Sequence, residues 1–487
     1  MKKYSKTSAA QLAGLSPQII TIEADITNGL HSFSIVGLAD KAISESRDRV
    51  ASAIKNSGFV SPKQKNQKVV ISLSPAQIRK EGSIFDLGIA VAYLFAANEV
   101  RGDLNDKIFL GELSLEGKVL GVRGILPIVM GLEQFGFTEV YIPRMNIHEV
   151  SLIDTITIYP VDSLREIIDH LSGARLIQQM TVSVSPLIES PQQDCRDMAS
   201  IRGNEHVKRA LMIAAIGRHN VLLFGPPGVG KTMLAQAFAG ILPDLSNTQI
   251  LETTSIHSVS RQVQQGERTL SRRPPIRAPH HTSSYSAMIG GGSPVSPGEI
   301  ALAHNGVLFL DELPEFDRRS IEALRQSMEE KFITISRLKE SVRYPSNFIF
   351  IGAMNPCPCG YGDARCKCSE PEQKKYRSKI SGAISDRIDI FIPMRRISTE
   401  QLREAPPEST LVLRDKIHRI QEFQQRRQKG ILTDSAIDFL RENAERLSLS
   451  NRASVRIIEL AQSIADLSLS EIITKEHLLE ALQYRQS

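Results

Sequence analysis

The 487-residue sequence contains no tryptophan and no apolar run long enough to cross a bilayer, which takes about 20 residues. Its first residues also lack the apolar stretch and the cleavage site of a secretory signal peptide. Neither sign of charge dominates, since 59 basic and 54 acidic side chains leave a net charge of +5. That balance neither demands nor excludes a nucleic-acid partner. We therefore expect a cytoplasmic protein with no membrane partner.

Cysteine is also scarce, and four of the five cysteines lie close together in the sequence. This distribution argues against a secreted disulfide scaffold. The four form a C-x-C…C-x-C set: Cys357, Cys359, Cys366 and Cys368. Four thiolates in one short loop can surround Zn²⁺ at about 2.3 Å, although the usual spacing is C-x₂-C. The pattern leaves two alternatives, a structural zinc site or a loop of reduced thiols.

Residues 225–232 match the phosphate-binding pattern G-x-x-x-x-G-K-[ST] at every position. An apolar run typical of a buried strand precedes this loop, and a helical pattern follows it. Glycines allow successive backbone N–H groups to point at the α- and β-phosphates of ATP. We expect Lys231 to reach the β- and γ-phosphates and the Thr232 hydroxyl to bind Mg²⁺. The residues expected to contact the nucleotide are Gly225, Pro226, Pro227, Gly228, Val229, Gly230, Lys231 and Thr232.

Two further apolar runs end in polar side chains, as strands do beside a phosphate loop. Residues 306–310 lead into Asp311 and Glu312, and residues 348–354 lead into Asn355. We expect Asp311 to hold Mg²⁺ through water and Glu312 to polarise the attacking water. Asn355 could hydrogen-bond both the γ-phosphate and that water. A solvent-exposed strand end is the alternative for each of them taken alone.

Two arginines are candidates for contacts with the γ-phosphate. Arg387 stands before a fourth apolar run, where it would be far from the nucleotide of its own subunit. It therefore suits a finger inserted into a neighbour's site. Arg452, at the start of a helix near the C-terminus, could contact the γ-phosphate of its own subunit. The adjacent His280 and His281 should point in opposite directions in an extended segment, which disfavours joint metal binding.

The order of these motifs resembles that of an AAA+ ATPase with a helical lid. Residues 277–282, 290–299, 301–315 and 355–360 are further similar to the YifB/ComM proteins, the magnesium-chelatase-like AAA+ family of bacteria. The resemblance covers essentially the whole chain. It implies a homo-oligomer, a hexameric ring, that uses ATP and Mg²⁺. It also implies DNA as a partner, because ComM proteins are helicases that promote branch migration during natural transformation.

The N-terminal part resembles the Lon-type protease fold, in residues 80–87 and 117–124. Lon-type proteases use a Ser–Lys dyad. Here Ile84 stands where the serine belongs, Ser83 comes one position early, and no lysine occurs from 119 to 207. We therefore interpret this part as non-proteolytic.

The predicted fold class is α/β, with a Lon-like α/β domain, an AAA+ core with a parallel sheet and a C-terminal helical lid. The expected boundaries are 1–171 for the Lon-like domain, 172–195 for a linker, 196–394 for the core and 395–487 for the lid. The favoured function is an ATP-driven motor on DNA. A remodeller of a protein or metal-chelatase partner is the alternative, and an ATP-dependent protease is disfavoured by the missing dyad.

Overall fold

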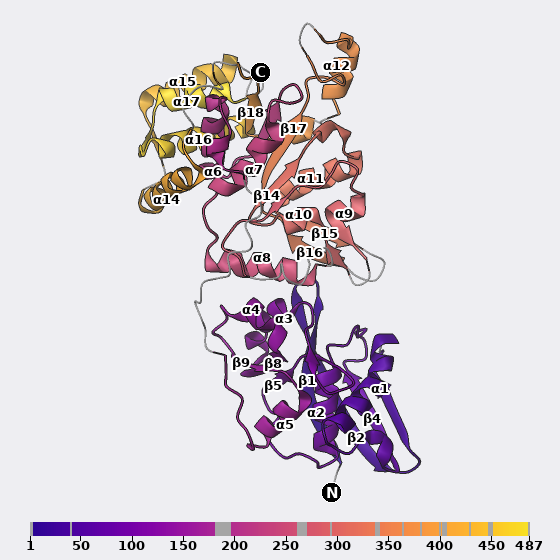
Figure 1. The fold of residues 1–487 in the computed structure, drawn as a ribbon. Helices are drawn as coiled ribbons and strands as arrows, with labels where there is room; N and C mark the ends of the chain where they lie inside the picture. The colour runs from indigo at the N-terminus through magenta and orange to yellow at the C-terminus, as the bar shows by residue number, and fades with distance from the viewer. Residues whose placement is uncertain are drawn as a thin grey trace. The chain divides into compact units, whose positions relative to one another are not determined.

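The computed structural model describes residues 3–38, 41–180, 196–260, 270–292, 295–336, 341–362, 365–379, 382–398, 401, 407–427, 430–446 and 451–485 (Figure 1). Packing divides the chain into two compact units. The first comprises Met1–Ile188, Asn247–Ser271 and Gly292–Ser296, and the second comprises Glu189–Ser246, Arg272–Gly291 and Pro297–Ser487. Most of the expected linker, from 181 to 195, lies outside the described residues.

The first unit contains a four-stranded sheet in the order β1-β2-β4-β3 and a three-stranded parallel sheet in the order β5-β8-β9. The strands are β1 (Tyr4–Ala13), β2 (Ser16–Asn28), β3 (Ser32–Val36), β4 (Gln67–Ser74), β5 (Lys107–Phe109), β8 (Glu139–Pro143) and β9 (Thr157–Val161), with a small hairpin of β6 (Glu112–Leu113) and β7 (Val119–Leu120). The helices are α1 (Lys41–Asn56), α2 (Asp86–Ala96), α3 (Ile125–Gly131), α4 (Ile147–Val150) and α5 (Leu164–Leu171). Alternating burial along β2 and β4 reflects sheets with one face on the core.

A helix from much later in the sequence also belongs to the first unit. Helix α8 (Asn247–Val259) packs on α3, and Leu251 contacts the apolar core of that unit. The Ser255 hydroxyl lies 3.3 Å from the Met130 sulfur. By sequence, α8 falls within the segment expected to form the ATPase core, so the unit boundary is not a single point along the chain.

The second unit is built on a five-stranded sheet in the order β11-β14-β17-β10-β18, in which every described pair is parallel. These strands are β10 (Val221–Phe224), β11 (Ile276–Arg277), β14 (Val307–Leu310), β17 (Ile349–Met354) and β18 (Ile390–Pro393). The apolar runs predicted as strands from the sequence are confirmed as β10, β14, β17 and β18. Strand β10 lies between β17 and β18, so the chain switches direction across the sheet there, and ligands of open α/β sheets bind at such points.

Helices surround this sheet and continue into the C-terminal part of the same unit (Figure 1). They are α6 (Glu205–Gly217), α7 (Lys231–Ile241), α9 (Tyr285–Ile289), α10 (Glu299–Leu302), α11 (Arg318–Glu330), α12 (Glu370–Arg377), α13 (Gly382–Ser385), α14 (Thr410–Arg426), α15 (Asp434–Arg446), α16 (Asn451–Leu467) and α17 (Lys475–Gln483). Two short pairs complete it, the hairpin β15 (Phe332–Ser336) with β16 (Ser341–Pro345), and β19 (Ile431–Leu432) with β20 (Ile472–Ile473).

Apolar spacing and capping residues in the sequence predict helices near 410–428, 434–447, 452–467 and 475–484, and all four are present within two residues of these bounds. Thr433 is one of the caps that the sequence predicts, and its hydroxyl accepts the backbone N–H of Ala436 at 3.2 Å at the start of α15. Apolar residues of α14 and α16 share one buried core with α6, α7 and the sheet, so these helices are packed on the core rather than joined to it by a linker alone.

Among the described residues, no helix is both long enough and apolar enough to span a bilayer.

Candidate nucleotide-binding site

The phosphate-binding pattern forms the connection between β10 and α7. Gly228 and Gly230 have φ values of +80° and +92°, in the left-handed region that favours glycine, so the loop can fold back over the start of the helix. Helix α7 begins at Lys231, directly after Gly230, which has no side chain to cap the first turn. The N–H groups of that turn therefore remain suited to an anion.

The Lys231 side chain is buried and makes three hydrogen bonds within the protein. Its ammonium donates to the carbonyl oxygens of Gly225 at 2.7 Å and Pro226 at 3.1 Å, and to Asn355 Oδ1 at 2.8 Å. Burial lowers the pKa of Lys231, and the nearby carboxylates of Asp311 and Glu312 oppose that shift. The structure thus brings the loop lysine and the asparagine at the end of β17 together, although 124 positions separate them in the sequence.

Thr232 and Asp311 offer the oxygen pair that a magnesium ion requires. The Thr232 hydroxyl donates to Asp311 Oδ2 at 2.7 Å. Neighbouring ligands of an octahedral Mg²⁺ with bonds of 2.0–2.1 Å lie about 2.9 Å apart. A hydroxyl and a carboxylate at this separation fit two adjacent ligand positions, either directly or through water. These two residues could therefore hold the metal that accompanies a nucleoside triphosphate.

Glu312 occupies an unusual backbone position at the end of β14. Its φ of +52° is left-handed, and its N–H donates to Asp311 Oδ1 at 2.9 Å. Its side chain lies 3.2 Å from His281 Nδ1, measured to Glu312 Oε2. Sequence reasoning missed this contact, and the opposite orientation expected for the two histidines was wrong, because the rings of His280 and His281 lie 4.1 Å apart. No periodicity links residue 281 to residue 312, so only the adjacency of β11 and β14 could have suggested it.

Arg387 and Arg452 meet at a different place. Arg387 is only 4% exposed, and its guanidinium donates to Glu329 Oε2. Arg452 Nη2 lies 3.3 Å from the other oxygen of the same carboxylate. Both ion pairs lower the pKa of Glu329, chiefly through the hydrogen bond from Arg387. The contacts of Arg452 therefore join it to Arg387 and Glu329 rather than to the phosphate loop.

This arginine pair lies toward the N-terminal ends of the strands. Arg387 precedes β18, whose Ile390 pairs with Val221 at the start of β10, whereas the phosphate loop follows the end of β10. The two groups of candidate residues are thus at opposite edges of the sheet. The arginine pair and the phosphate loop of one chain therefore cannot contact the same nucleotide.

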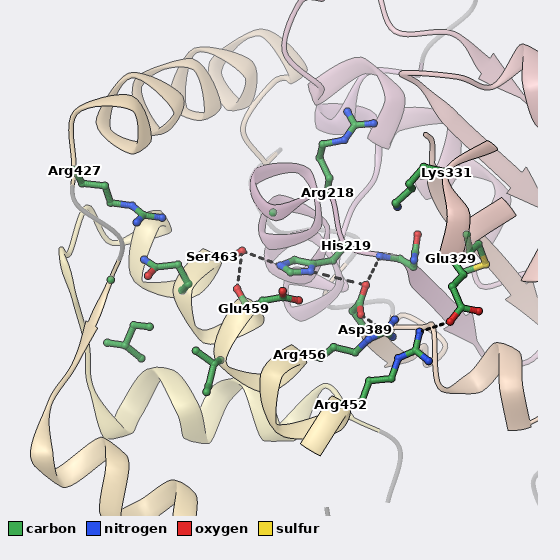
Figure 2. Close-up of a pocket in the computed structure, with 17 residues that line it drawn as sticks. Arg218, His219, Glu329, Lys331, Asp389, Arg427, Arg452, Arg456, Glu459 and Ser463 are labelled. Carbon is green, nitrogen blue, oxygen red and sulfur yellow. Dashed lines mark hydrogen bonds and ion pairs between the residues drawn. The ribbon is translucent and has the colours of Figure 1, made fainter. Parts of the chain in front are cut away.

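A pocket of about 660 Å³ adjoins the arginine pair and includes Glu329 and Arg452 in its lining (Figure 2). Its cationic lining residues are Arg218, Lys331, Arg427, Arg452 and Arg456, and its carboxylates are Glu329, Asp389 and Glu459. Burial and the nearby Arg218 guanidinium lower the pKa of Lys331. Positive charge is in excess here, which suits an anionic ligand such as a phosphate.

The four clustered cysteines converge on one point. Their sulfur atoms all lie within 4.8 Å of one another, and Cys357 Sγ is 3.3 Å from Cys359 Sγ and 3.5 Å from Cys366 Sγ. A tetrahedral zinc site with Zn–S bonds of 2.3 Å has sulfur atoms about 3.8 Å apart, whereas a disulfide requires about 2.05 Å. The thiols are therefore unbridged and spaced for a metal. Backbone N–H groups of Tyr361 and Lys367 lower the pKa of Cys359 to about 6, whereas burial and hydrogen bonds with neighbouring thiols raise the pKa of Cys357.

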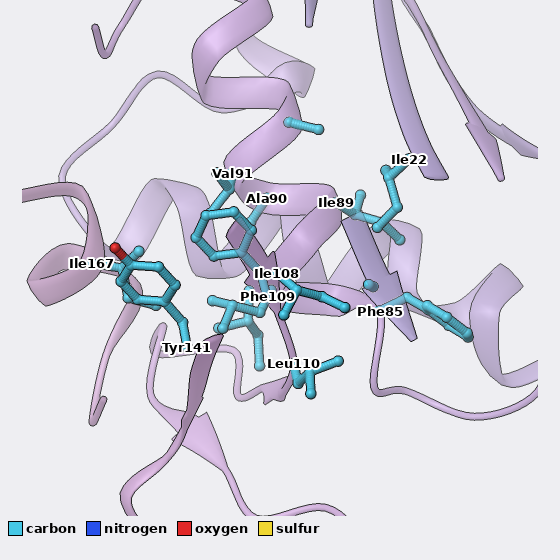
Figure 3. Close-up of a cluster of buried hydrophobic side chains, with 14 of the residues drawn as sticks. Ile22, Phe85, Ile89, Ala90, Val91, Ile108, Phe109, Leu110, Tyr141 and Ile167 are labelled. Carbon is cyan, nitrogen blue, oxygen red and sulfur yellow. The ribbon is translucent and has the colours of Figure 1, made fainter. Parts of the chain in front are cut away.

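The first unit lacks the contacts of a Ser–Lys dyad at the residues considered from the sequence. Helix α2 is almost wholly buried, with Ile89, Ala90 and Val91 in the apolar cluster of Figure 3, and it follows the segment that contains Lys80 and Ser83. Within that segment, the Ser83 hydroxyl donates to Glu112, and the fully buried Lys80 donates to the Pro75 carbonyl. Lys118 is exposed and pairs with Glu116. Serine and lysine side chains here thus have different partners.

The parallel sheet, the phosphate loop and the carboxylates at its edge define the class of P-loop nucleotide-binding proteins. Comparison with protein families identifies the branch of that class. Residues 197–402 match the family described as magnesium chelatase, subunit ChlI. Residues 22–146 match the family of subunit ChlI of Mg-chelatase, and residues 422–485 match its C-terminal family.

Individual relatives match over nearly the whole length. The competence protein ComM of Haemophilus influenzae is 36% identical, over 99% of this chain and 96% of its own. YifB of Escherichia coli is 37% identical, over 97% of this chain and 95% of its own. A magnesium-chelatase subunit ChlI homologue of Methanocaldococcus jannaschii is 23% identical over 58% of this chain and 82% of its own. The chain belongs to the YifB/ComM family of magnesium-chelatase-like AAA+ proteins.

Proposed function

We propose that this protein is an ATP-hydrolysing ring motor that acts on DNA, as a branch-migration helicase in recombination or natural transformation. The observation that carries the ATPase part is the convergence of Lys231, Thr232, Asp311 and Asn355 at one edge of the sheet. These four come from three separate strand ends. Phosphoryl transfer needs a cation on the phosphates, ligands for Mg²⁺ and an acceptor for the attacking water. Lys231 suits the first role, Thr232 with Asp311 the second, and Asn355 the third.

Each of these residues would have a distinct task during hydrolysis. Lys231 would exchange its bonds to Gly225, Pro226 and Asn355 for bonds to the β- and γ-phosphates. Asn355, released from Lys231, would orient the γ-phosphate and the attacking water. Glu312 would polarise that water. Mg²⁺ held by Thr232 and Asp311 would supply charge neutralisation on the phosphates.

The finger role of Arg387 is supported by strand register. Phe224, at the end of β10, pairs with Pro393, and Arg387 lies six positions before Pro393. At about 3.3 Å per residue, up to about 20 Å of backbone separates Arg387 from the phosphate loop of its own chain. An arginine side chain is much shorter than that distance. Arg387 would therefore serve the nucleotide of a neighbouring subunit, which requires a ring, and a hexamer is the form we propose.

Arg452 would act on the same face as Arg387. The sequence favoured contact with the γ-phosphate of its own subunit, but its guanidinium shares Glu329 with Arg387. The excess of positive charge in the adjoining pocket suits a neighbour's triphosphate as well. Glu329 would hold both arginines until that phosphate competes for them.

The DNA part of the proposal is tested by ATPase assays on assembled rings. The second unit exposes basic side chains that could contact backbone phosphates, among them Arg318, Arg319, Lys374 and Lys375. Such contacts hardly depend on base identity. We expect single-stranded or branched DNA to stimulate hydrolysis with little sequence preference. Stimulation should weaken with salt, by a log–log slope of about −0.7 per contact on single strands, while basal turnover changes less.

A second candidate function is the remodelling of a protein or a metal-chelatase partner. The matches to magnesium-chelatase ChlI families over three separate segments favour it. The two functions differ in what stimulates the ATPase. If intact rings ignore every DNA structure at low salt, the DNA motor is excluded and the remodelling function takes its place.

We further propose that the first unit is a Lon-like, non-proteolytic platform and that α14–α17 form the lid. Along the sequence, the boundaries that we propose are 1–171, 172–195, 196–394 and 395–487, with α8 packed in the first unit. The four cysteines would hold a structural Zn²⁺, which the sulfur spacing supports. Elemental analysis of protein purified under reducing conditions tests this, with about one zinc per chain expected.

A further inference from the structure

The four-cysteine cluster is directly continuous with the candidate catalytic asparagine. Asn355 follows β17, and Pro356 alone separates it from Cys357, which is fully buried. Asn355 holds Lys231 at 2.8 Å through its side-chain oxygen. A change in the position of Cys357 therefore shifts Asn355, because the only residue between them, Pro356, has a restricted backbone. Asn355 is the side chain that we expect to contact the γ-phosphate.

The cysteine loop also touches the phosphate loop. Gly360, between the two C-x-C pairs, has a φ of +87°, and a Cβ there would lie 3.1 Å from Pro227 Cδ and 3.3 Å from its Cγ. The left-handed backbone thus favours glycine, and a Cβ at this position would crowd Pro227. Because Pro227 is part of the nucleotide-binding loop, the position of the cysteine loop limits the conformations open to that loop.

Helix α12, which follows Cys368, packs against the C-terminal ends of β10 and β17. Arg377 donates to the Pro356 carbonyl at 3.4 Å, and its guanidinium lies 5.7 Å from the ring centre of Phe224, the last residue of β10. The Tyr376 side chain of the same helix is buried. The thiol cluster therefore connects the segment after Asn355 to helix α12, and α12 in turn contacts the ends of β10 and β17.

We propose that metal occupancy of the four-cysteine cluster controls the ATPase site, with Zn²⁺ holding Asn355 and Pro227 in the arrangement that hydrolysis requires. This rests on the proposed ATPase function and on the proposed zinc site. With zinc bound, four metal–sulfur bonds fix both C-x-C pairs relative to each other. Without it, the two C-x-C pairs lose the metal–sulfur bonds between them, and the segment that follows Asn355 can rearrange.

The experiment uses the full-length protein with excess Mg²⁺ and a zinc-selective chelator. Four quantities are measured before and after chelation: zinc per chain, ATP affinity, turnover at saturating ATP, and hydrogen exchange of residues 349–362. We expect chelation to lower turnover by about 10-fold to 100-fold, the usual effect of disturbing residues that orient a site. Hydrogen exchange across residues 349–362 should accelerate. ATP affinity should change less, because the carbonyl and helix contacts of the phosphate loop remain.

Variants separate the cluster from unspecific effects of the chelator. Cys366→Ser with Cys368→Ser removes half of the ligands at the end away from Asn355, so it should lower turnover as chelation does and no longer respond to the chelator. Cys195→Ser, which alters the one cysteine outside the cluster, should bind zinc and hydrolyse ATP as the wild type does. Adding zinc back should restore the wild type but not the double variant.

Each proposal has its own contradicting result. Wild-type protein without bound zinc overturns both the zinc site and its control of hydrolysis. Stoichiometric zinc whose removal changes neither turnover nor hydrogen exchange overturns the control and leaves the zinc site standing. If the zinc-loaded wild type shows no turnover, the ATPase function fails, and hydrogen exchange at residues 349–362 still decides whether metal and strand end are coupled.

Discussion

Replacement of Lys231 by methionine removes the ammonium of the phosphate loop while keeping most of the side-chain volume. In the structure this ammonium is buried and has three oxygen acceptors at 2.7, 2.8 and 3.1 Å. Burial lowers its pKa, so its charge is held at a cost in the nucleotide-free protein. We therefore expect Lys231→Met to fold normally and to fail specifically in binding ATP.

The magnitude follows from the hydrogen bonds exchanged on binding. A hydrogen bond to a charged group contributes about 1.5–3 kcal/mol, so two bonds to the β- and γ-phosphates contribute about 3–6 kcal/mol. Wild-type Lys231 gives up its bonds to Gly225, Pro226 and Asn355 when it binds the phosphates. The net loss of ATP-binding free energy in the variant should therefore lie near the lower end of that range. At about 1.4 kcal/mol per factor of ten, a loss of about 3 kcal/mol raises the dissociation constant for ATP about 100-fold.

The assay measures ATP affinity by calorimetry and by thermal unfolding. At an ATP concentration 100 times its dissociation constant, the wild type should gain about 2.7 kcal/mol of stability, and the variant only about 0.4 kcal/mol. Lys208→Met is the matched control, because Lys208 is a buried lysine of the same unit that pairs with Glu205 instead. A Lys231→Met protein that binds ATP within about threefold of wild type, a difference below 1 kcal/mol, refutes the assignment.

Other predictions concern hydrolysis, assembly and the first unit. Glu312→Gln should bind ATP but turn it over at least about 100-fold more slowly, and an active variant would mean that another group positions the water. His281→Ala should raise DNA-free turnover at saturating ATP, because it frees Glu312; a fall would show that the pair positions Glu312 for attack. Mixed rings of Arg387→Ala and Lys231→Ala subunits should recover part of the ATPase activity, and rings proven mixed but inactive contradict a finger in trans. The protein should not degrade unfolded substrates, and any cleavage lost on Ser83→Ala would contradict the non-proteolytic assignment.

The cluster at the sheet edge could be predicted because it depends on local patterns that the fold then brings together. Each polar group follows a short apolar run, and parallel strands place their C-terminal ends at one edge. Knowing that 307–310 and 349–354 are strands is therefore enough to expect Asp311 and Asn355 near Lys231. The helices near the C-terminus were predicted for the same reason, since their apolar spacing and caps are local.

The partners of these residues could not be predicted, because they depend on the packing of elements far apart in the sequence. Glu329 is one carboxylate on an amphipathic helix with several, 58 positions from Arg387 and 123 from Arg452. Nothing in its neighbourhood marks it. Likewise, α8 looks like part of the ATPase segment, and only its contacts with α3 assign it to the first unit.

Residues expected to act on the nucleotide share one property in this structure: each is already paired within the protein. The pairs are Lys231 with Asn355, Thr232 with Asp311, Glu312 with His281, and Arg387 with Glu329. A charged group that leaves such a partner needs a replacement of equal strength, or the exchange is unfavourable. A triphosphate with its metal can replace the partners at the C-terminal ends of the strands, whereas the proposed finger role assigns a neighbouring subunit's triphosphate to Arg387 at the opposite ends. If Arg387 acts in trans as proposed, nucleotide binding alone would rearrange three of these four pairs, and the Arg387–Glu329 pair would wait for assembly. Ring formation would then be a condition of hydrolysis rather than a consequence of it.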